Sequence, residues 1–234
     1  MKMKLLVLII ISTGLLALGV IRSASKITQQ PKDVPPKNQL QWHVKQAKDE
    51  GRQKVQISAP VVDYLGSVVD TDQALSLYSL VVATPIEKRT YQITDNIVTW
   101  YKFSIVESLT ELKNPVCFGC QSAVPPSDML PLNPNEFLLA KSGGKVVLEG
   151  VEIDEVDAGY PEFQVNERYL LLISLYPSGV AITAGGPTGV FKIGETGTLM
   201  PINDRPALLK EGVKSRFGNS LASVKAHLKL QHSR

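Results

Sequence analysis

A chain of 234 residues, 44% of them hydrophobic, is long enough and apolar enough to bury an ordinary core, which excludes a wholly disordered chain. The formal net charge of +3 conceals three regions: residues 1–58 hold ten Lys or Arg against three Asp or Glu, residues 59–204 hold eight against eighteen, and residues 205–234 hold seven against one. Because phosphate contacts need a clustered cationic surface, the acidic middle argues against a nucleic-acid-binding core, and we expect no nucleic-acid partner.

The N-terminus has the pattern of an export signal. Lys2 and Lys4 precede an uncharged apolar segment, residues 5–21, and Arg22 follows it. A basic start before an apolar segment of this length is typical of a signal peptide or of a short transmembrane helix. We therefore predict that residues 1–25 are a signal peptide or membrane anchor, and that the protein is exported. It would be anchored in the inner membrane or be periplasmic or extracellular, with cleavage left open.

A linker and a short helix are expected next. Residues 26–38 are polar and rich in proline, which is typical of an extended linker. Leu40, Val44 and Ala47 recur at helical spacing before Gly51, so we predict a short helix within residues 39–54.

Residues 55–200 have the texture of β-structure. Alternating or continuous apolar runs bounded by Gly and Pro predict strands at 55–58, 78–83, 91–94, 98–107, 136–141, 145–153, 169–175, from 180, and at 189–193. Thr99, Tyr101, Phe103 and Ile105 are expected on the core face of their strand, and Val147, Val151 and Ile153 on the inner face of theirs. The run 169–175 is expected to have both faces covered.

These elements predict an all-β fold, namely a small antiparallel barrel or sandwich of OB-like type. A membrane or signal helix precedes this domain, and short helices flank it. Residues 201–234 are expected to be a basic tail with a terminal helix that Asn219 or Ser220 caps.

Three segments together resemble a group of uncharacterised exported bacterial β-barrel proteins. They are DTDQALSLYSLVVATPIEKRTY, TWYKFSIVESL, and GGKVVLEGVEIDEVDAGYPEFQVNERYLLLIS followed by GPTGVFKI. Their order is also similar to that of netrin-like modules with an OB-type barrel. The resemblance covers about residues 59–194. It implies a barrel and export, but it implies no catalytic residue, and the chain lacks the cysteines on which netrin-like protease inhibitors depend.

Cys117 and Cys120 are the two cysteines of the chain, and they lie in a proline-rich loop, residues 110–136. In an exported protein this pair favours a local disulfide, with a thiol-redox pair or a metal site as alternatives. Long loops in compact domains are often functional. We therefore predict a possible binding surface at Phe118, Gln121 and Met129.

No catalytic constellation can be assembled from the sequence. His43, His227 and His232 lie outside the predicted barrel without a spacing partner. An acidic segment lacks the ligand pattern of a calcium loop and is expected to form an acidic outer face; it comprises Glu149, Glu152, Asp154, Glu155, Asp157 and Glu162.

We expect no cofactor and no metal, and the sequence favours a non-enzymatic protein over an enzyme. The sequence favours a non-enzymatic exported or membrane-anchored binding or assembly module of the cell envelope. Its partner would be an envelope protein or polymer, and it would contact the membrane through residues 5–21. The alternative is a thiol-redox protein that uses Cys117 and Cys120.

Overall fold

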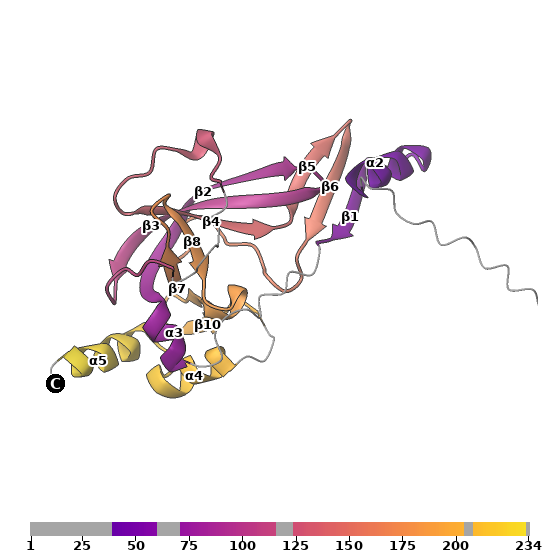
Figure 1. Ribbon diagram of the computed structural model, residues 1–234. Coiled ribbons are helices and arrows are strands. Elements are labelled where there is room, and N and C mark those ends of the chain that lie inside the picture. The colour runs from indigo at the N-terminus through magenta and orange to yellow at the C-terminus, as the bar shows by residue number, and fades with distance from the viewer. Residues whose placement is uncertain (1–38, 60–70, 116–123, 204–207, 233–234) are drawn as a thin grey trace, which may run out of the picture. The chain divides into compact units, whose positions relative to one another are not determined.

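The computed structural model describes residues 39–59, 71–115, 124–203 and 208–232 (Figure 1). Residues Asn38–Arg234 form one compact unit. Strands account for 42% and helices for 26% of the structure, so the fold is mostly β with four short α-helices among the described residues. The expectation of an all-β chain is therefore corrected to a mostly β chain.

The larger sheet has seven strands in the order β10-β9-β7-β2-β3-β4-β8. Neighbours pair antiparallel, except that β4 and β8 are parallel, and β7 pairs with β8 as well. The strands are β2 (Ser79–Ile93), β3 (Asn96–Ser108), β4 (Glu136–Ser142), β7 (Tyr169–Leu175), β8 (Val180–Thr183), β9 (Val190–Ile193) and β10 (Leu199–Pro201).

Alternation along the strands divides the apolar residues between two cores. One core takes side chains from β2, β3, β4, β7 and β8, and its centre is a group of aromatic rings. Phe103 stacks on Phe137 with ring centroids 5.1 Å apart, and it packs edge-on against Phe163 and Tyr169. The predicted core face of β3 is confirmed, since Tyr101 and Phe103 are fully buried there.

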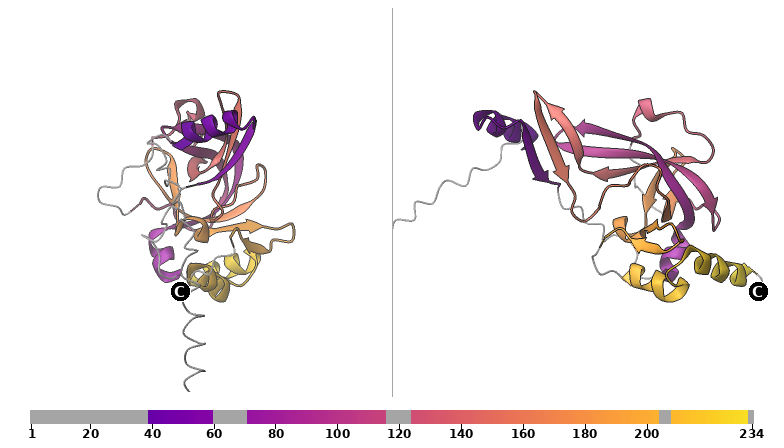
Figure 2. Two further views of the ribbon diagram at one scale, coloured as in Figure 1. Left: turned by 90° about the vertical axis from the view of Figure 1, so that its right-hand side faces the viewer. Right: turned by 180° about the vertical axis from the view of Figure 1, so that it is seen from behind.

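The opposite face of β2 and β7 packs against helices. Leu80, Val82, Leu170 and Leu172 share a second core with the helices α3 (Thr71–Leu77), α4 (Leu208–Phe217) and α5 (Leu221–His232). Both faces of β7 are thus covered, as the continuous apolar run predicts. Figures 1 and 2 show α3, α4 and α5 gathered near β7 and β10, and α3–α4 and α4–α5 are in contact.

A smaller three-stranded sheet has the order β1-β6-β5, with β1 (Lys54–Ser58) parallel to β6 (Val151–Val156) and β5 (Gly144–Leu148) antiparallel to it. The predicted N-terminal helix is α2 (Gln39–Asp49). It buries Leu40, Val44 and Ala47 against this sheet, as their spacing predicts. Figure 2 shows α2 lying beside β1.

One predicted strand, residues 145–153, is in fact the β5–β6 hairpin. The chain turns at Glu149 and Gly150, whose φ angles are 48° and 83°, the left-handed region that two-residue hairpin turns use. Val147 is on the strand before the turn and is 69% exposed, so its predicted inner position is wrong. Val151 and Ile153 lie after the turn and are buried as expected.

Two further elements differ from expectation. The separate strands predicted at 78–83 and 91–94 belong to one long strand, β2, whose pairing with β3 shifts register near Ala83 and Pro85. Helix α4 was not predicted, although its buried residues Leu209, Val213 and Phe217 recur at the four-residue spacing of a helix face. The predicted cap of α5 is Ser220, whose Oγ accepts a hydrogen bond from the Ser223 N–H at 3.1 Å.

Two short 3-10 helices complete the described elements, η2 (Ser127–Met129) and η3 (Gly186–Gly189). No helix in the described part of the chain has the length and apolar character needed to cross a membrane. The predicted signal or anchor, residues 1–25, and the linker lie outside the described residues.

Candidate binding site

Most of the predicted site residues lie outside the described part of the chain. This holds for Cys117, Cys120, Phe118 and Gln121, within residues 116–123. The choice between a disulfide and a redox pair therefore stays a prediction.

Met129 is described, and it is not on the surface. Its side chain is fully buried in a small core with Trp100, Leu138 and Val180. Met129 ends η2, so it fixes the proline-rich loop to the sheet from beneath. Met129 is therefore not part of an exposed binding surface, and this part of the prediction is wrong.

An open hollow of about 730 Å³ lies where the end of this loop meets the turn between β7 and β8. We call it the rim hollow. Residues 130–134 form one side and residues 175–179 the other, and Asn114 and Glu136 complete it. The sequence pointed to this loop, but only the fold brings the β7–β8 turn against it.

Main-chain hydrogen bonds fix the 175–179 side of the rim hollow to neighbouring segments. The Leu138 N–H donates to the Gly179 carbonyl at 2.9 Å, and the Leu175 N–H donates to the Lys113 carbonyl at 2.9 Å. Gly179 has a φ of 81°, and a Cβ atom there would lie 2.4 Å from Leu132 Cδ1. Glycine is therefore favoured at this turn for its left-handed backbone, and a larger residue would also displace the end of the Leu132 side chain.

The described lining of the rim hollow is largely uncharged. Its one charged group, the Glu136 carboxylate, accepts hydrogen bonds from the Asn133 main-chain N–H at 3.0 Å and from Asn133 Nδ2 at 2.7 Å. These bonds hold the pKa of Glu136 below its ordinary value. Leu130 is 42% exposed at the edge of the hollow and adds an apolar group to its otherwise mixed lining.

A polar cluster fixes η2 beside the rim hollow. The Asp128 carboxylate accepts hydrogen bonds from the Tyr91 hydroxyl at 2.8 Å and from Arg89 Nη1 at 2.6 Å. The pKa of Asp128 is lowered first by the Tyr91 hydrogen bond and then by that from Arg89. Since both partners come from β2, this cluster ties the loop to the sheet.

A second polar group lies at one end of the aromatic core. Lys141 is 5% exposed; its Nζ donates to the Ser142 carbonyl at 3.0 Å and lies 6.0 Å from the Tyr160 ring centroid. Glu155 is 4% exposed, and its Oε1 has no hydrogen-bond partner. The predicted outer-face position of Glu155 is therefore wrong. Its place in β6, two residues after the buried Ile153, was the signal in the sequence.

The electrostatics of this pair follow from its burial. Burial lowers the pKa of Lys141, and the Asp157 and Glu162 carboxylates oppose that shift. Burial raises the pKa of Glu155, and a hydrogen bond from the Ile97 main chain opposes it. No direct ion pair joins Lys141 to Glu155. Within the described residues no group of three or more His, Cys, Asp or Glu could hold a metal ion.

We expect replacement of Glu155 by Gln to change the pH dependence of stability. Because the folded-state pKa of Glu155 lies above 4.5, its contribution to stability is present below that pH and is lost as the pH rises through the folded pKa. The stability of Glu155→Gln relative to the wild type should therefore improve as the pH is raised from about 4 to about 8. Urea unfolding across this range measures the difference.

Glu152 on the same strand is the matched control. A hydrogen bond from Lys54 lowers its pKa, so its contribution is present at neutral pH and is lost on acidification. Glu152→Gln should therefore lose relative stability as the pH rises. The same pH trend in both variants would contradict the burial argument.

Comparison with protein-family models, with curated proteins and with solved structures gives no match to this chain.

Proposed function

We propose that this protein is a non-enzymatic, exported binding module of the cell envelope that takes an apolar segment of a partner protein in the rim hollow. The observation that carries the proposal is the largely uncharged hollow with Leu130 exposed at its edge. Exposed apolar surface rimmed by polar groups is typical of protein interaction sites.

We also propose that β2, β3, β4, β8 and β7 make an OB-like barrel. Two observations support it: β7 pairs with β8 as well as with β2, and all five strands contribute side chains to one aromatic core. In OB-type barrels the loops between particular strands carry the ligand, and the turn before the last barrel strand is one of them. In the proposed barrel, the β7–β8 turn, which lines the rim hollow, would occupy that place.

The proposal that the protein is exported and attached to a membrane is based on residues 5–21. A basic start followed by an uncharged apolar segment supports delivery across a membrane, and the proline-rich residues 26–38 would separate the folded domain from it. The partner is then an envelope protein that meets the module outside the cytoplasm.

The chemistry of the lining favours a protein segment over other partners. Nucleic acids and other polyanions need clustered cations, and the hollow presents none among its described residues. Apolar and proline side chains instead offer non-directional contacts to Leu-like or aromatic side chains. Leu130, Leu132 and Tyr176 would supply most of that contact.

Site-specific photocrosslinking in native cells tests the proposal. A photoreactive phenylalanine analogue replaces Leu130 in the full-length chain, and a second variant carries it at Val147, which is 69% exposed on β5. We expect a discrete protein adduct from position 130 alone. Leu130→Asp should then weaken binding of that purified partner about tenfold, since it places a charge in an apolar contact. Val147→Asp should leave binding unchanged.

Two outcomes would overturn the proposal. One is the absence of any adduct from position 130 when the protein is present at its native level. The other is the same adduct from positions 130 and 147, which would show contact without a specific site.

A further inference from the structure

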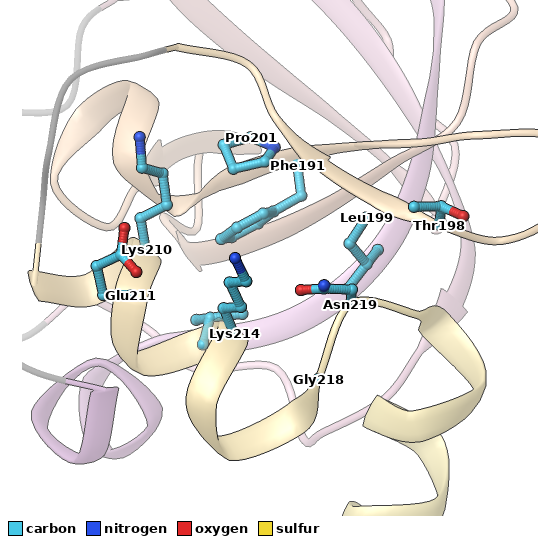
Figure 3. A pocket seen from close by; sticks show the side chains of 10 residues that line it. Phe191, Thr198, Leu199, Pro201, Lys210, Glu211, Lys214, Gly218 and Asn219 are labelled. Carbon is cyan, nitrogen blue, oxygen red and sulfur yellow. The ribbon is translucent and has the colours of Figure 1, made fainter.

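A second cavity, of about 220 Å³, lies between α4, the α4–α5 connection and the strands β9 and β10 (Figure 3). We call it the helix pocket. Its floor is apolar: Phe191, Leu199 and Val213 line it and are at most 8% exposed. Lys210, Lys214 and Asn219 provide polar groups around it. It shares no lining residue with the rim hollow.

The wall of the helix pocket is fixed by main-chain hydrogen bonds. Gly218 has a φ of 77°, and its N–H donates to the Lys214 carbonyl at 2.9 Å, which ends α4. The Leu199 N–H then donates to the Asn219 carbonyl, and the Leu221 N–H donates to the Gly197 carbonyl. Because strand and turn are bonded to each other, Asn219 and Leu199 hold a set position in the pocket.

The two lysines of the pocket differ in their partners. Lys210 Nζ donates to the Asn203 carbonyl at 3.2 Å, and Figure 3 shows it pointing away from the Phe191 ring. The Lys214 ammonium points toward the Phe191 ring, and the Asn219 amide is turned toward the same place. The Lys214 ammonium forms no hydrogen bond or ion pair with any described residue, whereas the side chains of Arg216 and Lys225 on the same basic segment are paired with Asp72 and Glu107.

We propose that the helix pocket binds a small monoanionic ring compound, an aromatic carboxylate. Its ring would cover the Phe191, Leu199 and Val213 floor, and its carboxylate would accept hydrogen bonds from Lys214 Nζ and from the Asn219 amide. Charge-assisted hydrogen bonds of this kind are stronger than neutral ones, and ring stacking on Phe191 adds apolar contact.

Size and charge limit this ligand. The volume is below the roughly 300–1,000 Å³ of pockets for drug-sized molecules, so one ring with one short substituent fits best. Glu211 also lines the pocket and, in Figure 3, lies on the side of Lys214 away from Asn219. A second acid group on that side would meet the Glu211 carboxylate, and this disfavours a dianion.

Fluorine NMR with 4-fluorobenzoate tests the proposal on the full-length protein. We expect saturable line broadening with 4-fluorobenzoate and binding about tenfold weaker with 4-fluorobenzamide, which has the same ring without the charge. Lys214→Met should weaken 4-fluorobenzoate binding by about the same factor. Lys229→Met removes an equal charge from α5, outside the pocket, and should leave binding unchanged.

A charge reversal supplies the second test. Lys214→Glu should abolish 4-fluorobenzoate binding and create binding of 4-fluorobenzylamine, because the variant places two carboxylates beside the same apolar floor. The proposal is overturned if 4-fluorobenzoate does not bind. It is also overturned if Lys214→Met binds it like the wild type, or if acetate competes with it at equal concentration.

Discussion

Replacement of Phe103 by Ala is expected to lower the free energy of unfolding by about 3–5 kcal/mol, the usual cost of removing a buried phenylalanine ring. The effect is large because Phe103 is fully buried and packs against four other rings, those of Tyr101, Phe137, Phe163 and Tyr169. Each such ring pair adds about 0.5–1.5 kcal/mol to burial alone. A loss of this size approaches the whole stability of a typical domain, so we expect partial unfolding without denaturant.

Urea unfolding followed by tryptophan fluorescence measures this loss, since Trp100 lies three residues away on the same strand and is 1% exposed. The free energy of unfolding of Phe103→Leu should lie between those of Phe103→Ala and the wild type. Ile86→Ala changes a side chain on β2 that is 41% exposed, and it should cost less than about 1 kcal/mol. Equal losses from Phe103→Ala and Ile86→Ala would mean that the aromatic core does not exist as described.

Replacement of Gly144 by Ala is expected to cost about 3 kcal/mol, from overpacking and backbone strain together. A Cβ atom at Gly144 would lie 2.3 Å from Thr99 Oγ1 and 2.7 Å from Thr90 Cγ2, and the φ of Gly144 is 136°. The Thr99 hydroxyl cannot move away freely, because it donates to the Gly143 carbonyl at 2.6 Å. The substitution therefore acts where β4 passes into the β5–β6 hairpin.

Gly150 is the matched control for this substitution. Its φ is 83°, but no atom lies within 4 Å of the position that its Cβ would take. Gly150→Ala thus carries the backbone strain without the clash and should cost only about 1–2 kcal/mol. Denaturant midpoints of the two variants, measured side by side, separate the two effects. A Gly144→Ala variant no less stable than Gly150→Ala would contradict the packing of β5 against β2 and β3.

Local patterns predicted the elements whose burial follows one simple period. The alternation in β3 identified Tyr101 and Phe103 as core residues, and the continuous apolar run identified β7 as a strand covered on both faces. Helical spacing identified the buried stripe of α2. In each case the pattern of neighbouring residues alone decides which side chains face inward.

The same patterns failed where a single turn changes which side chains face inward. The turn at Glu149 and Gly150 separates β5 from β6, so Val147 and Val151 lie on different strands. Their even spacing in the sequence therefore does not place them on the same face of one strand. Glu155 lies two residues after Ile153 on the same strand, so its side chain faces the interior as that of Ile153 does, although its charge suggests the surface.

The sequence by itself determined that strands make up most of this protein's domain and that Tyr101 and Phe103 face its main core, although it predicted an all-β fold. Only the tertiary structure decided where its surface is hollow. The rim hollow joins residues 130–134 to residues 175–179, and the helix pocket joins Phe191 and Leu199 to Lys214 and Asn219. A concave site forms where segments that are distant in the sequence pack together. The local periodicity of apolar residues does not predict which segments those are.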